Sequence, residues 1–225
     1  MAQKNSKKRK SVSRKPTSII ETTCVPLRLA SPVDTTEAAT SPLSIDIARI
    51  AWDWRNLIVT ILRLLAWHRL DFTMQHQQQT NWCWAAVSTS VALFYDPVST
   101  WTQCAVANGE LGRNDCCDAG AGGPCNVYGF LGSSLARVGH LDHIVNSSSA
   151  FADVQTEVNA GRLLCARTEW SGGGAHFLAI IGYRVLDEMV AVDDPWYGKS
   201  DLSYATFSSS YQGLGSWTDS YFTQP

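Results

Sequence analysis

Three separate stretches of the chain carry residues that could act together as a nucleophilic active site. The first is Asn81-Trp82-Cys83-Trp84-Ala85-Ala86, where Cys83 falls in the first turn of a predicted helix. Unpaired backbone N–H groups and the helix macrodipole favour a thiolate over a thiol at that position. Because the thiolate is the nucleophilic form, its position gives Cys83 a means of activation. Taken alone, Cys83 would be interpreted as a buried structural cysteine, since free cysteines are often buried.

A histidine and a pair of carboxylates lie in the second half of the chain. His176 follows three glycines and opens the apolar run 177–180, so we expect it at the mouth of a strand. Asp193 and Asp194 end the next apolar run. Antiparallel pairing would bring that end near His176, where a carboxylate can orient the imidazole and stabilise the imidazolium. Alternation along the strand lets only one of the two aspartates face the site.

Hydrophobic periodicity divides residues 71–225 into a helical half and a strand half. We predict helices over about 82–95, 101–108, 127–138 and 150–160, with Asn81 as the N-cap of the first. Gly109, Gly139 and Gly161 stand where helix C-caps belong. Strands are predicted over 162–170, 175–185, 189–193, 202–204 and 216–222. The expected fold class is α+β, with a cleft between the helices and an antiparallel sheet.

The motifs resemble those of the papain-like cysteine peptidases and stand in that family's chain order of Cys, His, then Asn or Asp. They are Cys83-Trp84-Ala85-Ala86, Ala175-His176-Phe177 and Asp194-Pro195-Trp196. The likeness is greatest to the bacterial branch with an Asn-Trp-Cys-Trp motif, which includes effector peptidases of plant pathogens and is similar to staphopains and bacteriocin-leader peptidases. It covers residues 71–225. It implies a papain-like fold and cleavage of a protein or peptide substrate, without a metal or organic cofactor.

The resemblance also implies a role for each residue of the triad. Cys83 would be the nucleophile and His176 the general base and acid. Asp194 would orient the ring, because it precedes Pro-Trp as the family's Asn or Asp precedes a small residue and Trp; Asp193 is the alternative. Trp196 would cover the His–Asp contact and exclude water. The same kind of site also serves transglutaminases, deamidases and acyltransferases, and a non-catalytic binding module is a further alternative.

A glutamine with the family spacing precedes the cysteine. Gln77 lies six residues before Cys83, and the resemblance implies that its amide and the Cys83 backbone N–H form the oxyanion hole. Gln78 and Gln79 are competing candidates. Thr80 departs from plant papains and cathepsins, which have a cysteine at that position. The 93 residues between Cys83 and His176 are also fewer than the roughly 130–150 of those enzymes, so loops and subsites must differ.

Cysteines cluster in the helical half. Of the seven in the chain, four lie within residues 104–125: Cys104, Cys116, Cys117 and Cys125. The papain family has disulfides in the corresponding part, so disulfides are one interpretation. A zinc site that includes His140 and His143 is a second, although the spacing fits no common zinc template, and reduced thiols are a third. Cys165 is predicted to lie in the core and Cys24 to be free in the tail.

The segments before the peptidase-like part differ from it in composition. Residues 1–43 are rich in Lys, Ser, Thr and Pro and are predicted to be a disordered tail. Residues 44–70 form a predicted amphipathic helix, with Ser44 as N-cap and a wide apolar arc, so we expect this helix to bury most of its surface. An inhibitory pro-segment, a membrane-interface helix, a docking helix and simple packing on the following domain are its possible functions.

Composition excludes several classes of protein. A chain of 225 residues with 45% hydrophobic residues is too apolar for a wholly disordered polymer. No uncharged apolar run approaches the roughly 20 residues of a membrane span. Residues 1–15 carry seven basic side chains and no acid, which leaves a formal charge of −9 on the remainder of a chain with net charge −2. An acidic body disfavours nucleic acid as a partner. No Sec signal follows the basic run, so we expect a cytoplasmic protein or export by a non-classical, effector-type route.

Overall fold

The computed structural model of the chain describes residues 47–118 and 122–225. Predictions for residues 1–46, including the disordered tail and the Ser44 N-cap, lie outside these residues. The helices are α1 (Ile47–Leu65), α2 (Cys83–Tyr95), α3 (Gln103–Leu111), α4 (Gly122–Cys125), α5 (Leu131–Val138), α6 (Phe151–Asn159) and α7 (Tyr204–Ser210). The strands are β1 (His68–Arg69), β2 (Leu141–Val145), β3 (Leu164–Trp170), β4 (Ala175–Arg184), β5 (Met189–Asp194), β6 (Gly198–Ser203) and β7 (Gly215–Thr223).

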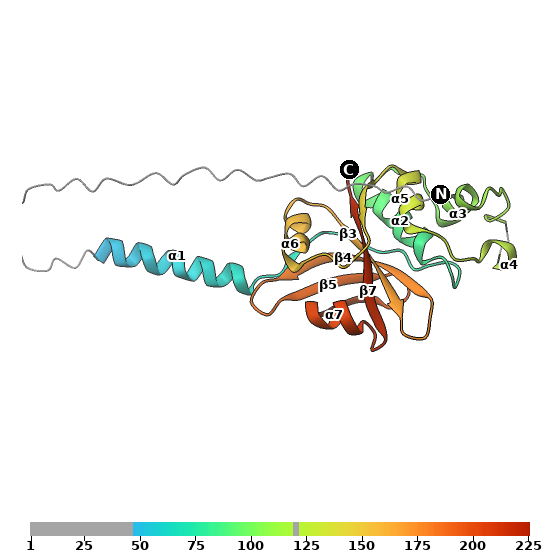
Figure 1. The fold of residues 1–225 in the computed structure, drawn as a ribbon. Coiled ribbons are helices and arrows are strands. Elements are labelled where there is room, and N and C mark those ends of the chain that lie inside the picture. Colours follow the sequence, from blue (N-terminus) through green and yellow to red (C-terminus); the bar gives the residue numbers. More distant parts are fainter. Residues whose placement is uncertain (1–46, 119–121) are drawn as a thin grey trace, which may run out of the picture. The chain divides into compact units, whose positions relative to one another are not determined.

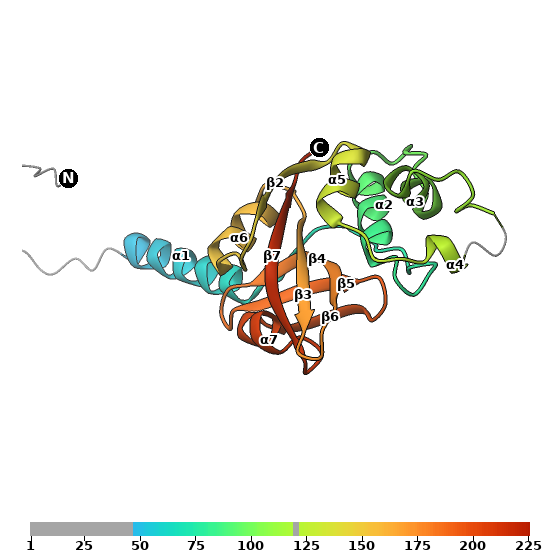
Figure 2. The ribbon, with the colours of Figure 1, turned by 45° about the vertical axis from the view of Figure 1, so that its right-hand side comes forward.

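All seven strands belong to one antiparallel sheet. Its order is β2-β7-β3-β4-β5-β6, and β1 pairs with β4 outside that path. Helices α2 to α5 gather beside the strands, while α6 and α7 lie against the sheet (Figures 1 and 2). The helical half therefore precedes the sheet half along the chain, which confirms the predicted α+β class.

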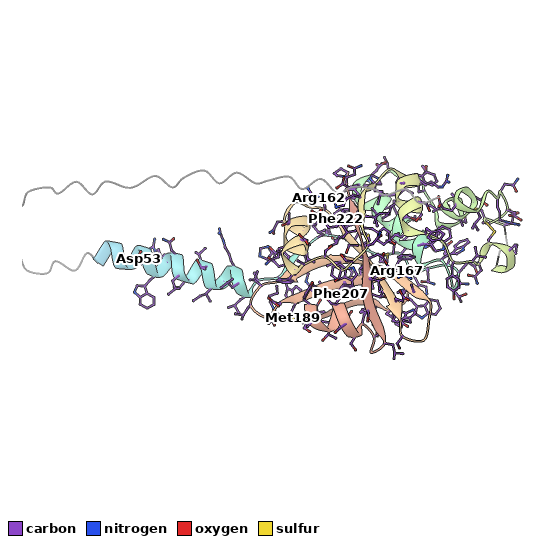
Figure 3. All side chains as sticks on the ribbon, in the orientation of Figure 1. Asp53, Arg162, Arg167, Met189, Phe207 and Phe222 are labelled. Atoms are coloured by element: carbon purple, nitrogen blue, oxygen red, sulfur yellow. A yellow bond between two sulfur atoms is a disulfide. The ribbon has the colours of Figure 1, made fainter. Side chains whose placement is uncertain are left out.

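The central strand β4 separates two hydrophobic cores. Phe177, Ala179 and Ile181 pack in a cluster with α2, α3 and α5. The alternate residues Leu178 and Ile180 pack in a second cluster with α6 and α7, to which α7 contributes Phe207 (Figure 3). Successive side chains of a strand point to opposite faces, so one apolar run anchors both helical groups to the same strand.

Helix α2 is buried on every side, which fits its sequence of small and apolar residues. All residues from 83 to 92 are buried. The three hydroxyl residues among them, Ser88, Thr89 and Ser90, each donate to the backbone carbonyl four residues earlier. Their polar groups are thereby satisfied without water. The helix that begins at Cys83 is consequently held as a rigid element against β4.

Several predicted boundaries were wrong for local reasons. Asn81 does not cap α2, because Trp82 occupies the cap position without a side-chain hydrogen bond. Helix α3 continues through Gly109 and ends at Gly112, whose φ of 61° is in the left-handed region. The predicted helix at 127 begins at residue 131 instead, since the preceding segment is extended. By contrast, Gly139 ends α5 with φ 92°, as predicted.

The short elements β1, β2, α4 and α7 were not predicted. β1 and β2 depend on pairing with β4 and β7 respectively, which no local pattern reveals. Residues 202–204, predicted as a strand, split between the end of β6 and the first residue of α7. The Ser203 side chain accepts a hydrogen bond from the Thr206 backbone N–H and so starts α7.

Helix α1 contradicts the expectation that it buries most of its surface. From residue 53 to the helix end at Leu65 its side chains are exposed, and Trp54 is 60% exposed. Asp53 is one of these exposed side chains (Figure 3). Near the helix end, the Leu64 carbonyl accepts a hydrogen bond from the Leu186 backbone N–H at 3.0 Å. Among the described residues, no helix has the length and apolar character that crossing a bilayer requires.

Candidate active site

A cavity of about 210 Å³ lies between the helical half and the sheet. It contains three of the four predicted site residues, Gln77, Cys83 and His176. The remaining lining residues are Thr80, Asn81, Tyr128, Trp170, Gly173, Gly174, Ala175, Trp196 and Tyr197. Segments nearly 100 residues apart in the chain, the start of α2 and the start of β4, thus meet at one cavity.

Strand register brings the histidine and one aspartate together. β4 and β5 pair with Ala179 opposite Asp193, so His176 and Asp194 lie on the same face, on neighbouring strands, in a diagonal relation. The His176 Nε2 and Asp194 Oδ1 atoms are 2.8 Å apart, and the Asp194 side chain is fully buried. Cys83 lines the same cavity as His176, and its interaction with the ring contributes to the raised pKa of the imidazole.

The two aspartates have different environments. The Asp194 Oδ1 also accepts the backbone N–H groups of Trp196 at 2.7 Å and Tyr197 at 2.9 Å. Asp193 faces the opposite way, and its Oδ2 accepts the Met74 backbone N–H at 2.9 Å. Burial raises the pKa of Asp193 above its ordinary value. The geometry therefore brings Asp194, and not Asp193, to the imidazole.

Charge stabilisation within the site favours the imidazolium form of the histidine. Burial lowers the pKa of His176, but the hydrogen bonds with Asp194 and Cys83, and their charges, outweigh burial and raise this pKa from 6.5 to about 9. Burial raises the pKa of Asp194, because it disfavours the charged carboxylate. The hydrogen bond and charge of His176, together with the two backbone N–H groups, outweigh burial, so the pKa of Asp194 lies below its ordinary value. The buried pair is thus an ion pair near neutral pH.

The residues around Cys83 hold it against the loop that follows α4. Asn81 donates its side-chain amide to the Asn126 carbonyl and its backbone N–H to the Asn126 side chain, both at 2.9 Å. The indole N–H of Trp82 donates to the Cys125 carbonyl at 2.7 Å, and the indole N–H of Trp84 donates to the Val127 carbonyl at 3.2 Å. These bonds replace the predicted capping role of Asn81. The Asn-Trp-Cys-Trp motif is therefore a set of donors that fastens α2 to residues 125–127.

Two disulfides stabilise the same loop. Cys104 pairs with Cys117, and Cys116 pairs with Cys125. This pairing agrees with the first of the three interpretations of the cysteine cluster and leaves these four sulfurs unavailable to zinc. Cys83 and Cys165 are the free cysteines among the described residues. Cys165 lies in the core on β3, as predicted, and burial raises its pKa.

Breaking the Cys116–Cys125 disulfide should affect the site more than breaking the other one, because Cys125 carries the carbonyl that accepts the Trp82 indole. We expect a Cys116→Ser/Cys125→Ser variant to lose about 2–3 kcal/mol of unfolding free energy together with activity. Denaturant titration and peptidase assay check this. The Cys104→Ser/Cys117→Ser variant is the matched control, which should lose stability but less activity. An intact mass equal to that of the fully reduced chain would contradict the pairing.

Gln77 lies in the cavity but its amide is already engaged. It is buried, and its Nε2 donates to the carbonyls of Gln79 at 2.9 Å and Thr80 at 2.8 Å. Its backbone N–H donates to the Pro195 carbonyl, which ties the residue to the strand end that carries the aspartates. Both amide hydrogens thus have partners before substrate binds. An oxyanion would have to share or displace one of these bonds.

Aromatic side chains other than the predicted one flank the histidine ring. Trp170 stacks on His176 with ring centroids 6.1 Å apart, and Tyr197 presents an edge at 6.0 Å. Trp196, expected to cover the His–Asp contact, instead stacks on His76 and is 47% exposed. Trp170 and Tyr197 could not be predicted from the sequence because neither belongs to a recognisable motif, and because strand pairing sets their distance from the ring.

Asp194→Asn should move the alkaline side of the activity profile. The imidazolium of His176 persists up to its pKa of about 9 because Asp194 and Cys83 stabilise it. Without the Asp194 charge, a cause that raises the pKa of His176 is lost while burial still lowers it, so this pKa falls. Activity should then decline at a pH at least about one unit lower than in the wild type. The rate of peptide cleavage against pH measures this shift.

Asp193→Asn is the matched control for that experiment. An asparagine at 193 can still accept the Met74 backbone N–H through its side-chain oxygen. The alkaline midpoint should therefore stay at the wild-type pH. A profile that shifts with Asp193→Asn and not with Asp194→Asn would contradict the assignment.

A helical half followed by an antiparallel sheet, with cysteine, histidine and carboxylate meeting between them, defines the class of papain-like cysteine peptidases. The chain belongs to the papain-like cysteine protease AvrRpt2 family, whose model matches residues 66–212. It is therefore a thiol protease that acts on protein substrates, which confirms the family predicted from the motifs.

The Pseudomonas avirulence protein AvrPphB, known from a crystal structure, is similar with 12% sequence identity and a TM-score of 0.33. The match covers 69% of this chain and 98% of that one. No curated protein matches the sequence.

Proposed function

We propose that the protein cleaves peptide bonds through a Cys83–His176–Asp194 triad and a covalent acyl-enzyme. The observation that carries the proposal is the buried His176, whose Nε2 is hydrogen-bonded to Asp194 and which lines one cavity together with Cys83. A ring held in this orientation can take a proton from the sulfur and pass it to the leaving group. The position of Cys83 in the first helical turn adds unpaired N–H groups beside the sulfur.

Each residue of the triad then has one task. The Cys83 sulfur attacks the carbonyl carbon of the scissile bond, and His176 passes its proton to the amine that leaves. Water, deprotonated by the same imidazole, releases the acyl group from sulfur and restores the thiolate–imidazolium pair. Asp194 keeps the ring oriented and balances its positive charge. No metal or organic cofactor takes part in these steps.

The oxyanion of the tetrahedral intermediate would bind at the start of α2. The Cys83 backbone N–H and the Gln77 amide are the donors that we assign to it. Gln77 lines the same cavity as Cys83, which supports this role. Its two existing bonds to backbone carbonyls imply that substrate binding is accompanied by a small movement of the amide.

Product analysis tests the reaction type. Purified protein would be incubated with a peptide library, and the products would be examined by mass spectrometry, with a thiol-directed epoxide as the inhibitor. Cleavage yields new amino termini, whereas a deamidase would yield an unbroken peptide with a mass change of about one unit, and a transferase a peptide joined to an added amine. Unbroken peptides under all conditions, with Cys83 unlabelled by the epoxide, would contradict the proposal.

We further propose that the peptidase unit begins near Ala66. β1 pairs with β4, and the Leu70 backbone N–H donates to the Ile181 carbonyl at 2.8 Å. Deletion of residues 1–65 should therefore leave the melting temperature and activity close to those of the full chain, because among the described residues none of α1 lines the cavity. Deletion of residues 1–70 removes β1 and should lower the melting temperature by several degrees.

Peptidase assays on the two truncated proteins also test whether the N-terminal part is inhibitory. A several-fold rise in activity on removing residues 1–65 would identify an inhibitory pro-segment, and an unchanged rate would exclude one. A protein lacking residues 1–70 that melts like the one lacking 1–65 would contradict the proposed start of the unit.

A further inference from the structure

The second oxygen of the buried aspartate has its own hydrogen-bond donor. While Asp194 Oδ1 accepts three hydrogen bonds, its Oδ2 accepts the Tyr211 hydroxyl at 2.7 Å. Within the described part of the chain, no other donor to Oδ2 is present. The aspartate side chain and Tyr211 are both fully buried. A buried charge is tolerated where its lone pairs have partners, so this hydroxyl completes the set for Asp194.

Tyr211 is itself held firmly in place. It follows α7 and exchanges two backbone hydrogen bonds with Gly215, both at 2.8 Å. Its ring stacks on Trp170 at 6.4 Å and meets the edge of Phe207 at 5.6 Å. Trp170 in turn stacks on His176, so tyrosine, tryptophan and histidine are in successive contact. The backbone pairing with Gly215 and the packing of its ring thus direct the Tyr211 hydroxyl at Asp194.

We propose that Tyr211 is a positioning residue of the active site, whose hydroxyl donates to Asp194 Oδ2 and keeps the carboxylate ionised and directed at His176. The inference rests on the proposed triad and adds a fourth residue to it. Without this donor, Oδ2 would be a buried anionic oxygen with no partner. The carboxylate would then take up a proton at a higher pH or turn away from the ring, and a protonated aspartate cannot balance an imidazolium.

The charged and titratable groups around Asp194 come from several elements. His176 approaches from β4 and Cys83 lies beyond the ring, at the start of α2. Tyr197 follows β5 and donates its backbone N–H. On the opposite face of β5, Asp193 is 3.8 Å from the Lys199 ammonium. Substitution of the Tyr211 hydroxyl therefore removes a hydrogen bond to Asp194 without removing a charge.

The test is Tyr211→Phe, which removes the hydroxyl and keeps the ring. We expect kcat to fall about tenfold or more while KM stays near the wild-type value, because a hydrogen bond to a charged group is lost. The acid-side midpoint of the activity profile should rise by about one pH unit. Alkylation of Cys83 by iodoacetamide against pH should show the same rise, and this readout needs no knowledge of the natural substrate.

Tyr183→Phe is the matched control. Tyr183 is also a buried tyrosine of the second cluster, and its hydroxyl donates to the Asn159 side chain at 2.8 Å, away from Asp194. This variant should lose comparable stability and leave the acid-side midpoint unchanged. If Tyr211→Phe and Tyr183→Phe give the same profile as the wild type, the proposal is overturned.

A double variant separates an effect through Asp194 from a general loss of packing. In the Asp194→Asn background the buried charge is absent, so adding Tyr211→Phe should cause no further loss of kcat. Should Tyr211→Phe alone fail to fold, the double variant should recover a cooperative melting transition for the same reason. A double variant that loses another tenfold, or stays unfolded, would overturn the role of Tyr211.

The same measurements distinguish this inference from the proposed triad. If wild-type protein is not alkylated at Cys83, or if Cys83→Ala keeps its activity, the triad itself fails. If the wild type behaves as expected and Tyr211→Phe behaves like Tyr183→Phe, the inference about Tyr211 fails alone.

Discussion

Cys83→Ala is expected to reduce peptide cleavage by at least about 10⁴-fold, the scale on which removal of a covalent nucleophile acts in related chemistry. The alanine side chain has no atom that can attack the carbonyl, while α2 should stay intact because alanine is a strong helix former and is only one atom smaller than cysteine. The measurement is kcat/KM on a peptide substrate, together with labelling by a thiol-directed epoxide. Both signals should disappear in the variant.

The chain offers a matched control in its other described free cysteine. Cys165 is fully buried on β3, and burial raises the pKa of its thiol, so it should remain unreactive in the native protein. Cys165→Ala should keep wild-type activity and lose only about 1 kcal/mol of stability through the cavity that it leaves. Retained cleavage in Cys83→Ala, or an epoxide adduct on Cys165, would refute the assignment of the nucleophile.

The second large effect is expected for His176→Gln, which should lower kcat by about 10³-fold or more. Glutamine can still donate a hydrogen bond to Asp194, but it can neither accept the cysteine proton nor pass one to the leaving amine. It also lacks the positive charge that the wild-type ring keeps up to a pKa of about 9. Alkylation of Cys83 by iodoacetamide at pH 6 should slow in parallel, because the thiolate loses its imidazolium partner.

His143→Gln controls for the loss of a histidine as such. His143 lies on β2 with a half-exposed side chain beside Asp142, stacks on Phe222, and is not among the residues that line the cavity. Its replacement should leave kcat unchanged. Equal losses in the two variants would show that His176 acts through stability alone, whereas a loss confined to His176→Gln supports its role in proton transfer.

Much of the architecture could be predicted from local patterns. The runs that became β3, β4, β5 and β7 are rich in apolar and β-branched residues and are bounded by turns. A long stretch of small and apolar residues predicts helix α2. β1 and β2 could not be predicted, because two and five residues of mixed character become strands only by pairing with β4 and β7.

Prediction of the site was strongest for the residues within motifs. Cys83 and His176 were predicted from the residues around them, and Gln77 from the spacing that the family resemblance implies; all three line one cavity in the structure. The choice between Asp193 and Asp194 depended on which face of β5 each occupies, and strand register decides that. The engaged amide of Gln77 was equally out of reach, since its partners are backbone carbonyls.

Residue types and their order along the chain were sufficient to indicate a helix-start thiol, a strand-start imidazole and a following carboxylate, because these are local features of composition and periodicity. The contacts that make them a working group are not local. The Tyr211 hydroxyl donates to Asp194, 17 residues earlier in the chain. The indoles of Trp82 and Trp84 each donate to a backbone carbonyl 43 residues further along the chain. Such contacts arise from packing and register in the folded chain, where distances bear no simple relation to sequence separation.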